Sequence, residues 1–183
     1  APEAAAQSTT LPLFDRVAVS GRVGATPTID IKAPLEIDGF KARVIEEGSG
    51  REITEGSPVL VAITAFDASS GRMLSESGRP QMSLGIVGSD EINSDLAMLV
   101  TGKREGSRIL AFRTITMGDG SPNAMEINVV DILPSIATGT PVDASVGPMS
   151  VEMSPEGPII SHIDTLPGGV TTQVLIKGDG VQV

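Results

Sequence analysis

Residues 40–67 read FKARVIEEGSGREITEGSPVLVAITAFD, and the interpretation of the whole chain starts from this stretch. It contains two runs of β-forming residues separated by glycine turns. The first run, residues 42–45, leads into Gly48-Ser49-Gly50, and the second, residues 59–66, follows Gly56. Apolar and β-branched runs that end at glycine clusters are typical of strands joined by turns. We therefore predict two strands here.

Further strands are predicted on both sides of this stretch. Residues 17–23 and 28–32 alternate apolar with polar or small side chains, and Pro34 stops the second run. Residues 81–85, 107–114 and 124–133 have similar patterns, and Pro134 ends the last one. Alternation of this kind predicts half-buried strands. Residues 1–10 are expected to be a flexible leader, and the apolar residues 11–14 to dock on the protein body or on a partner.

One helix is predicted, beginning near Ser89. Ser89 suits an N-cap, and the acidic residues 90 and 91 would lie in the first turn. An apolar stripe follows at helical spacing, and Gly102 is expected to end the helix in the left-handed conformation. The stripe consists of Ile92, Leu96, Leu99 and Val100.

Composition excludes several classes of protein and site. With 40% hydrophobic and 20% charged residues, the chain is expected to fold. Its net charge of −10 makes nucleic-acid binding unfavourable and leaves solubility or a basic partner as explanations. The chain contains no cysteine, which excludes disulfides and thiol chemistry. Aromatic residues make up only 2%, with no Tyr and no Trp, although ligand pockets are usually lined by aromatic side chains.

The C-terminal part repeats the beginning of the chain. Residues 173–180, QVLIKGDG, resemble residues 43–50, RVIEEGSG, and their glycines lie 130 residues apart. Upstream, residues 157–160 resemble residues 26–29. Such a period indicates tandem domains. We therefore expect a leader and extension in residues 1–39, a complete domain in residues 40–134, and a linker with the remnant of a second copy in residues 135–183.

The order strand, strand, split strand, helix, strand, strand resembles that of FKBP-type peptidyl-prolyl isomerases. The resemblance is carried by Gly48, Gly50 and Gly56, and by the helix that ends before Gly102. It implies an α+β fold, in which an FKBP-like antiparallel β-sheet is wrapped on one short helix, with strand-rich N- and C-terminal extensions. Residues 21–34 also resemble the segment that precedes isomerase-like domains in secreted actinobacterial lipoproteins.

The same resemblance implies a pocket whose chemistry has changed. FKBP-type isomerases bind proline in a dry aromatic pocket, and their pocket positions carry aliphatic, thioether or hydroxyl side chains in this chain. The strand Tyr is replaced by Ile63, the Phe-Asp pair by Leu74 and Ser75, and the pocket-floor Trp by Leu96. The remaining positions are Met82, Ile92 and Met125, so that the core character is kept while the aromatic walls and the carboxylate are lost.

Other chemistries have weaker support in the sequence. His162 is the only histidine, and its neighbour Ser161 would point to the opposite face of a strand. The ligands for zinc are missing, and Asp119 and Asp179 suit turns better than calcium loops. The methionines are expected to fill space left by missing aromatic residues, or to line a peptide groove. We expect no metal and no cofactor.

The functional hypothesis is a non-catalytic, extracytoplasmic binding or scaffold module; the alternative is a peptidyl-prolyl isomerase or folding chaperone. The chain starts APEAAAQ without Met, as expected of a processed protein. A lipidated cysteine upstream would be one way to anchor it to the outer face of the membrane. The expected partner is a protein, such as an integral membrane respiratory complex of actinobacteria. Residues 1–36, residues 138–183 or both are expected to wrap it, so that deleting both would leave the central domain folded.

Overall fold

The computed structural model describes residues 11–118, 123–135, 139–143, 149–154, 157–163, 168–170 and 172–178. The chain divides into two compact units, Ala1–Ser135 and Ile136–Val183. The predicted boundaries at residues 39 and 134 stay predictions. Within the described residues, none of the helices is long and apolar enough to cross a membrane.

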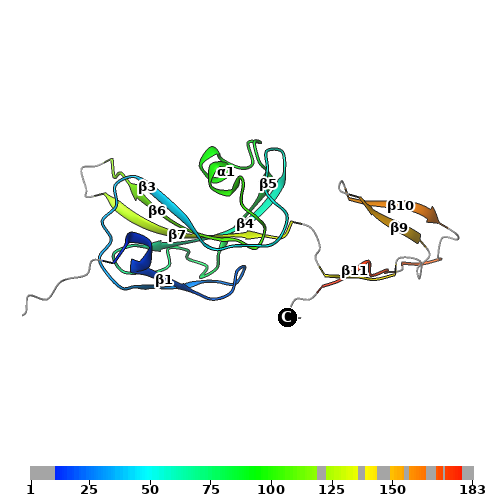
Figure 1. Cartoon of the computed structure of the whole chain (residues 1–183), viewed down its shortest axis with the longest axis horizontal. Helices are drawn as coiled ribbons and strands as arrows, with labels where there is room; N and C mark the ends of the chain where they lie inside the picture. The colour runs from blue at the N-terminus through cyan, green and yellow to red at the C-terminus, as the bar shows by residue number, and fades with distance from the viewer. Residues whose placement is uncertain are drawn as a thin grey trace, which may run out of the picture. The chain divides into compact units, whose positions relative to one another are not determined.

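The first unit is built on a five-stranded antiparallel sheet with one α-helix (Figure 1). The strand order is β3-β6-β7-β4-β5. The mostly antiparallel sheet with one helix is the architecture that the resemblance to FKBP-type isomerases predicts. Its elements are β3 (Phe40–Glu46), β4 (Pro58–Asp67), β5 (Gln81–Ile86), α1 (Ser94–Val100), β6 (Arg108–Ile115) and β7 (Ala124–Leu133).

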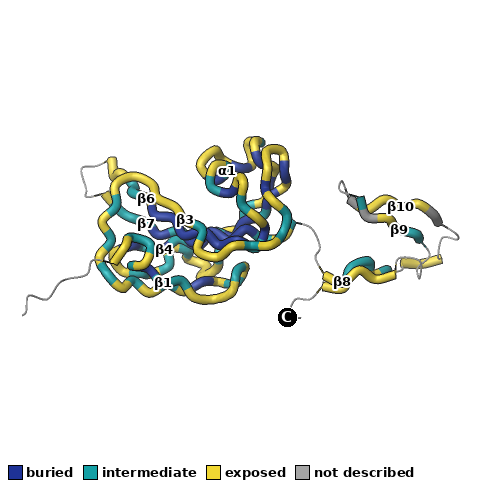
Figure 2. Tube along the Cα trace, viewed as in Figure 1, coloured by how far each residue is buried: buried dark blue, intermediate teal, exposed yellow. Residues whose placement is uncertain are grey.

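The two faces of this sheet are covered by different segments. We call the face that carries α1 the inner face and the opposite one the outer face. Helix α1 lies on one side of the sheet in Figure 1 and β1 on the other. The central strands β4, β6 and β7 are therefore apolar on both faces, and Figure 2 shows them as the buried middle of the unit. The inner core consists of Ile53, Val59, Val61, Val87, Ile92, Leu96, Val100, Ile109, Val130 and Ile132.

The outer face is covered by the N-terminal segment. A 3₁₀ helix, η1 (Leu13–Arg16), leads into the antiparallel hairpin of β1 (Val17–Ser20) and β2 (Thr28–Ile31). Phe14 packs on Phe112 of β6 with ring centroids 5.2 Å apart. The outer core consists of Val17, Phe66, Ala68, Leu110, Phe112, Ile127 and Val129, with Leu13, Phe14, Val19, Ile29, Ile31, Leu35, Ile37, Met73 and Met125 packed against it. Residues 13–37 therefore contribute to the core of their own domain, and the expectation that residues 1–36 wrap a partner is corrected for this part.

A buried ion pair fastens the tip of the hairpin to the sheet. Arg108 of β6 and Asp131 of β7 lie opposite each other, and Nε of Arg108 is 2.6 Å from Oδ1 of Asp131. Arg108 also donates to the carbonyls of Gly21 and Arg22, while the backbone N of Gly24 donates to Asp131 at 2.7 Å. The hydrogen bond to Asp131 raises the pKa of Arg108 despite the cost of burial. Each buried charge is thus neutralised and hydrogen-bonded, as buried charges require.

The helix begins later than the sequence predicts. Its N-cap is Asn93, whose Oδ1 accepts a hydrogen bond from the backbone N of Leu96 at 2.9 Å. The hydroxyl of Ser89 instead donates to the carbonyl of Ile86 at 2.7 Å, so Ser89 closes a turn after β5. Ile92 is buried, as expected, but it precedes the helix. Gly102 has φ +75°, which confirms the expected left-handed position after the helix.

The predicted split strand is present along β4. β5 pairs with the first half of β4, from Pro58 to Ile63. Beyond it, Met73 forms a bridge with Phe66, and the backbone N of Leu74 donates to the carbonyl of Ala65 at 2.8 Å. Leu74, Ser75 and Gln81, at the ends of these two segments, line the groove described below.

The second unit contains two small antiparallel pairs. β9 (Met149–Ser154) pairs with β10 (Gly157–Ile163), and β8 (Thr140–Pro141) pairs with β11 (Ile176–Lys177). The strand β10 begins with residues 157–160. These resemble residues 26–29, which include the start of β2 in the N-terminal hairpin. Of the residues 173–178, which resemble the end of β3 and the turn after it, only Ile176–Lys177 has strand geometry. The glycine at 180 and the chain end lie outside the described residues.

Candidate functional site

A groove of about 440 Å³ lies between α1 and the inner face of the sheet. It is where the resemblance predicts the binding pocket, and it brings together four of the seven predicted positions: Ile63, Leu74, Ser75 and Leu96. Its lining comprises Phe40, Ile63, Ala65, Leu74, Ser75, Gln81, Asn93, Asp95, Leu96, Leu99, Ala111, Arg113, Glu126, Asn128 and Val130.

The other three predicted positions lie elsewhere. Met82 of β5 is 54% exposed, and Met125 packs in the outer core. Ile92 is 3% exposed and belongs to the inner core beneath the turn before α1. For the two methionines, the neighbouring residues Gln81 and Glu126 line the groove instead, because consecutive residues of a strand point to opposite faces.

The floor of the groove is aliphatic. Ile63, Leu96, Leu99 and Val130 supply most of it, with small side chains between them. Among the described residues that line the groove, Phe40 is the only aromatic one, and it lies 55% exposed on the edge strand β3. The groove can bury an aliphatic side chain, but it lacks the large flat walls that a proline pocket provides.

Charged and amide side chains form the rim. Arg113 of β6 and Glu126 of β7 lie opposite each other, and Nε of Arg113 is 2.7 Å from Oε2 of Glu126. Arg113 is 55% exposed, so water reaches this end of the groove. Asp95 in the first turn of α1 adds a further acidic group, and Asn128 of β7, opposite Ala65 and Ala111, adds an amide from the sheet itself. The rim therefore provides hydrogen-bonding groups for a partner.

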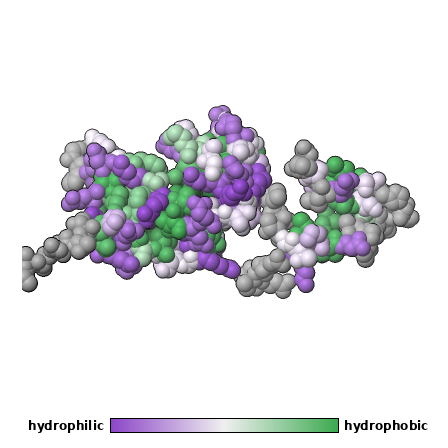
Figure 3. Space-filling view, in the orientation of Figure 1, coloured by the Kyte–Doolittle hydropathy of each residue, from purple (hydrophilic) through white to green (hydrophobic). Residues whose placement is uncertain are grey.

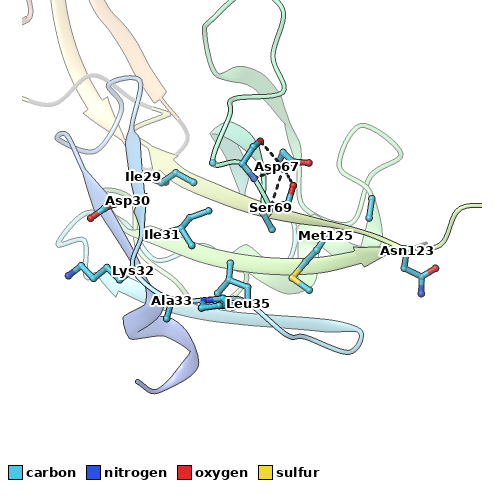
Figure 4. Close-up of a pocket in the computed structure, with 15 residues that line it drawn as sticks. Ile29, Asp30, Ile31, Lys32, Ala33, Leu35, Asp67, Ser69, Asn123 and Met125 are labelled. Carbon is cyan, nitrogen blue, oxygen red and sulfur yellow. Dashed lines mark hydrogen bonds between the residues drawn. The ribbon is translucent and has the colours of Figure 1, made fainter. Parts of the chain in front are cut away.

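A second hollow, of about 870 Å³, lies on the outer face (Figure 4). In Figure 4, Ile29, Ile31 and Leu35 lie on one side of it, and Asp67 and Met125 on the other. Figure 3 shows hydrophobic residues gathered across the middle of the first unit.

The carboxylate of Asp67 in this hollow is engaged by the turn that follows it. Oδ1 accepts hydrogen bonds from the hydroxyl and backbone N of Ser69 and from the same two groups of Ser70, at 2.6 to 3.0 Å. These hydrogen bonds lower the pKa of Asp67 from 3.8 to about 2, and the bond from the hydroxyl of Ser69 contributes most. This perturbed group therefore has a structural explanation.

Other candidate chemistries find little support. Ser161 and His162 both lie in β10, and the hydroxyl of Ser161 donates to the carbonyl of Ser150 at 3.2 Å. Within the described part of the chain, no three acidic or histidine side chains come together where they could hold a metal ion. Asp119 and Asp179 lie outside the described residues.

Comparison with solved structures finds peptidyl-prolyl isomerases. One is described as "Putative Peptidyl Prolyl cis-trans Isomerase FKBP12 from Mycobacterium tuberculosis", with 22% identity and a TM-score of 0.39 over 52% of this chain and 82% of that one. Another is FkpA from Escherichia coli, with 17% identity and a TM-score of 0.37 over 52% of this chain and 47% of that one. No protein-family model matches the chain, and comparison with curated proteins finds no match.

Proposed function

We propose that this protein is a non-catalytic binding module with an FKBP-like domain, which works outside the cytoplasm as an accessory subunit of a membrane protein complex. The observation that carries the non-catalytic part is the groove beside α1. Its floor is aliphatic, and its rim holds the solvent-exposed ion pair between Arg113 and Glu126.

This lining is unsuited to accelerating prolyl isomerisation. An isomerase must bind the twisted amide of the transition state better than the planar ground state, in a site that excludes water. Here Leu96 and Leu74 occupy positions where the resemblance implies aromatic walls, and Ser75 replaces the carboxylate. An exposed guanidinium at the rim keeps one end of the groove hydrated.

The partner is proposed to be a protein. The net charge of −10 favours a partner with a basic surface, and the aliphatic groove with its polar rim suits a peptide segment or a loop. A lipidated cysteine upstream would hold the module at the outer face of the membrane, and an actinobacterial respiratory complex is our specific candidate for the partner.

A prolyl-peptide isomerisation assay on the purified chain tests the catalytic part of this proposal. We expect the rate to equal the uncatalysed rate, while an active FKBP-type isomerase in the same buffer accelerates it. Clear acceleration would favour the alternative function, an isomerase or folding chaperone.

A matched pair of variants then identifies whether the groove is responsible for any acceleration. Leu99 lines the groove, whereas Met98 on the same helix is 75% exposed and does not. Activity that falls in Leu99→Gln and persists in Met98→Gln would assign catalysis to the groove and overturn the proposal. Activity that both variants keep would instead indicate a contaminating isomerase, and repurification should remove it.

A further inference from the structure

The two edges of the five-stranded sheet differ in how they are protected. The edge strand β3 carries Lys41, Arg43 and Glu46, and its pairing with β6 shifts register between Val44 and Glu46. Charges and irregular pairing are the usual means by which proteins prevent an edge strand from adding another strand. The opposite edge strand, β5, has the sequence QMSLGI and carries no charge.

β5 also exposes a row of large apolar side chains. Met82, Leu84 and Ile86 are 54%, 67% and 41% exposed, and they lie at every second position on the outer face. Gly85 faces the inner side, because a Cβ there would lie 2.7 Å from the Cβ of Glu91. The row therefore lies on the outer face, beside a strand edge that carries no charged residue.

Backbone groups of the same three residues face the free side of the strand. The backbone N of Val87 donates to the carbonyl of Ser57 at 2.9 Å, and its carbonyl accepts from Gly56 at 3.0 Å. Because hydrogen bonding alternates along an antiparallel strand, the backbone groups of Met82, Leu84 and Ile86 point away from β4. The carbonyl of Ile86 already accepts hydrogen bonds from the backbone N and the hydroxyl of Ser89, at 3.0 and 2.7 Å. Within the described residues, the groups that remain for another strand are therefore both backbone groups of Met82 and Leu84 and the N–H of Ile86. Within the described residues, the sheet ends at β5, so no described strand pairs with them.

We propose that β5 pairs with β5 of a second copy of this chain, antiparallel and about a two-fold axis perpendicular to the sheet. In the proposed register, Leu84 lies opposite Leu84 of the other copy and Met82 lies opposite Ile86. Residues of even number then meet residues of even number, so the outer face of one copy continues as the outer face of the other. The result is one sheet that runs through both copies.

The observations favour a second copy over an unrelated segment. The row Met82, Leu84, Ile86 becomes self-complementary when it is reversed, as an isologous two-fold contact requires. Two copies that each carry a net charge of −10 repel one another, and the uncharged β5 is an edge along which they can approach. A contact of two short strands is much smaller than the standard interface of about 1,600 Å², so we expect weak and concentration-dependent association.

Sedimentation of the full chain at increasing concentration, up to about 1 mM, tests the association. We expect a monomer–dimer equilibrium. Leu84→Lys places two ammonium groups opposite each other and should raise the dissociation constant at least about tenfold. Leu84→Thr, which keeps a good strand former, should weaken the dimer less. Ala42→Lys on the exposed edge β3 is the matched control and should leave the dimer unchanged.

Cross-linking tests the register directly, because residues 1–183 contain no cysteine. Leu84→Cys should form a disulfide-linked dimer on mild oxidation, since opposed residues lie about 5.5 Å apart between Cα atoms and disulfides span about 4.4–6.8 Å. Met82→Cys alone should not, because its two copies would lie about 14 Å apart. A mixture of Met82→Cys and Ile86→Cys should cross-link.

Three results would overturn the proposal. The first is a protein that stays monomeric at every concentration. This result counts against the proposal also when a different protein or segment is found to pair with β5. The second is a dimer that Leu84→Lys leaves intact while the melting temperature is unchanged, since the contact would then lie elsewhere. The third is self-cross-linking of Met82→Cys in preference to Leu84→Cys, which would exclude this register.

Discussion

Gly48 and Gly50 lie where two segments of backbone pass within contact distance. The backbone N of Gly50 donates to the carbonyl of Glu105 at 3.0 Å, and that of Gly48 donates to the hydroxyl of Ser107 at 2.9 Å. A Cβ on Gly48 would overlap the carbonyl oxygen of Glu105 and lie 2.5 Å from the backbone N of Ser107. The motif Gly48-Ser49-Gly50 is therefore explained by close backbone approach.

Gly48→Ala should destabilise the first unit. The atoms that the new methyl group meets belong to backbone, which cannot move aside by changing a rotamer. We expect the free energy of unfolding to fall by about 2 kcal/mol, measured by urea denaturation. Gly118→Ala is the control, because a Cβ there meets nothing within 4 Å, and its effect should stay within about 0.5 kcal/mol. Equal effects at both positions would contradict this explanation of the motif.

Asp67 should make stability depend on pH in the acid range. Its pKa is about 2 in the folded protein and 3.8 in its ordinary state, so the unfolded chain binds more protons between these values. The stabilisation by Asp67 is complete above 3.8 and is lost as the pH falls through about 2. Asp67→Asn should therefore be less stable than the natural chain at neutral pH, and the difference should shrink on acidification.

Urea denaturation of both chains at a series of pH values measures this difference. Removing the hydroxyl donors should have part of the same consequence, so the double variant Ser69→Ala, Ser70→Ala should lose part of the pH dependence that Asp67 provides, while the two backbone N–H donors keep the rest. If the difference between the natural chain and Asp67→Asn stayed constant down to the folded pKa of about 2, the turn would not be the origin of the stabilisation.

At the scale of elements, the sequence predicts which segments become strands and that one helix separates β5 from β6. Glycine turns, proline stops and alternation are local signals, and they suffice for this. The residue at which α1 starts cannot be chosen from local signals alone. Ser89 and Asn93 are both good caps by residue type, and the choice depends on whether β5 and its closing turn use the hydroxyl of Ser89 first.

The groove brings together only part of the pocket positions that the resemblance implies. Met82 and Met125 are one residue out of phase with the groove. Met125 lies on β7, which is covered on both faces, so its apolar character gives no indication of its side, and Met82 is an apolar residue that stays exposed on the outer face of β5. Gln81, Arg113 and Glu126 were missed for a related reason. Arg113 and Glu126 become partners only when the register of β6 and β7 is known.

The attachment of the N-terminal hairpin was also missed, although the sequence carries a signal for it. Arg108 and Asp131 are charged residues that flank the apolar runs of β6 and β7, and both are buried. Such residues require a partner, so a pair of opposite charges in neighbouring core strands indicates an ion pair. Its additional bonds to Gly21, Arg22 and Gly24 follow from the fold and could not be inferred from residue type.

At the scale of the whole molecule, the two ends of the chain have different relations to the first unit. Residues 13–37 cover the outer core, and the loop after β1 satisfies the buried pair Arg108–Asp131. Ser135, the last residue of this unit, also contributes, because its hydroxyl and backbone N donate to Oε1 of Glu105 at 2.7 and 3.1 Å. Burial raises the pKa of Glu105, but these bonds and Arg51 outweigh it, and the net shift is downward.

Two deletions should therefore behave differently. Removing residues 1–36 exposes the outer core and takes three hydrogen-bond partners from a buried ion pair, so we expect a loss of several kcal/mol and an unfolded or aggregated product. Removing residues 136–183 keeps Ser135 on Glu105 and should leave the first unit folded, with its thermal unfolding temperature nearly unchanged. On our proposed function, the C-terminal deletion should also abolish co-purification with a partner from solubilised membranes. A folded protein without residues 1–36 would contradict the structural assignment, whereas undiminished co-purification without residues 136–183 would move the docking surface to the first unit.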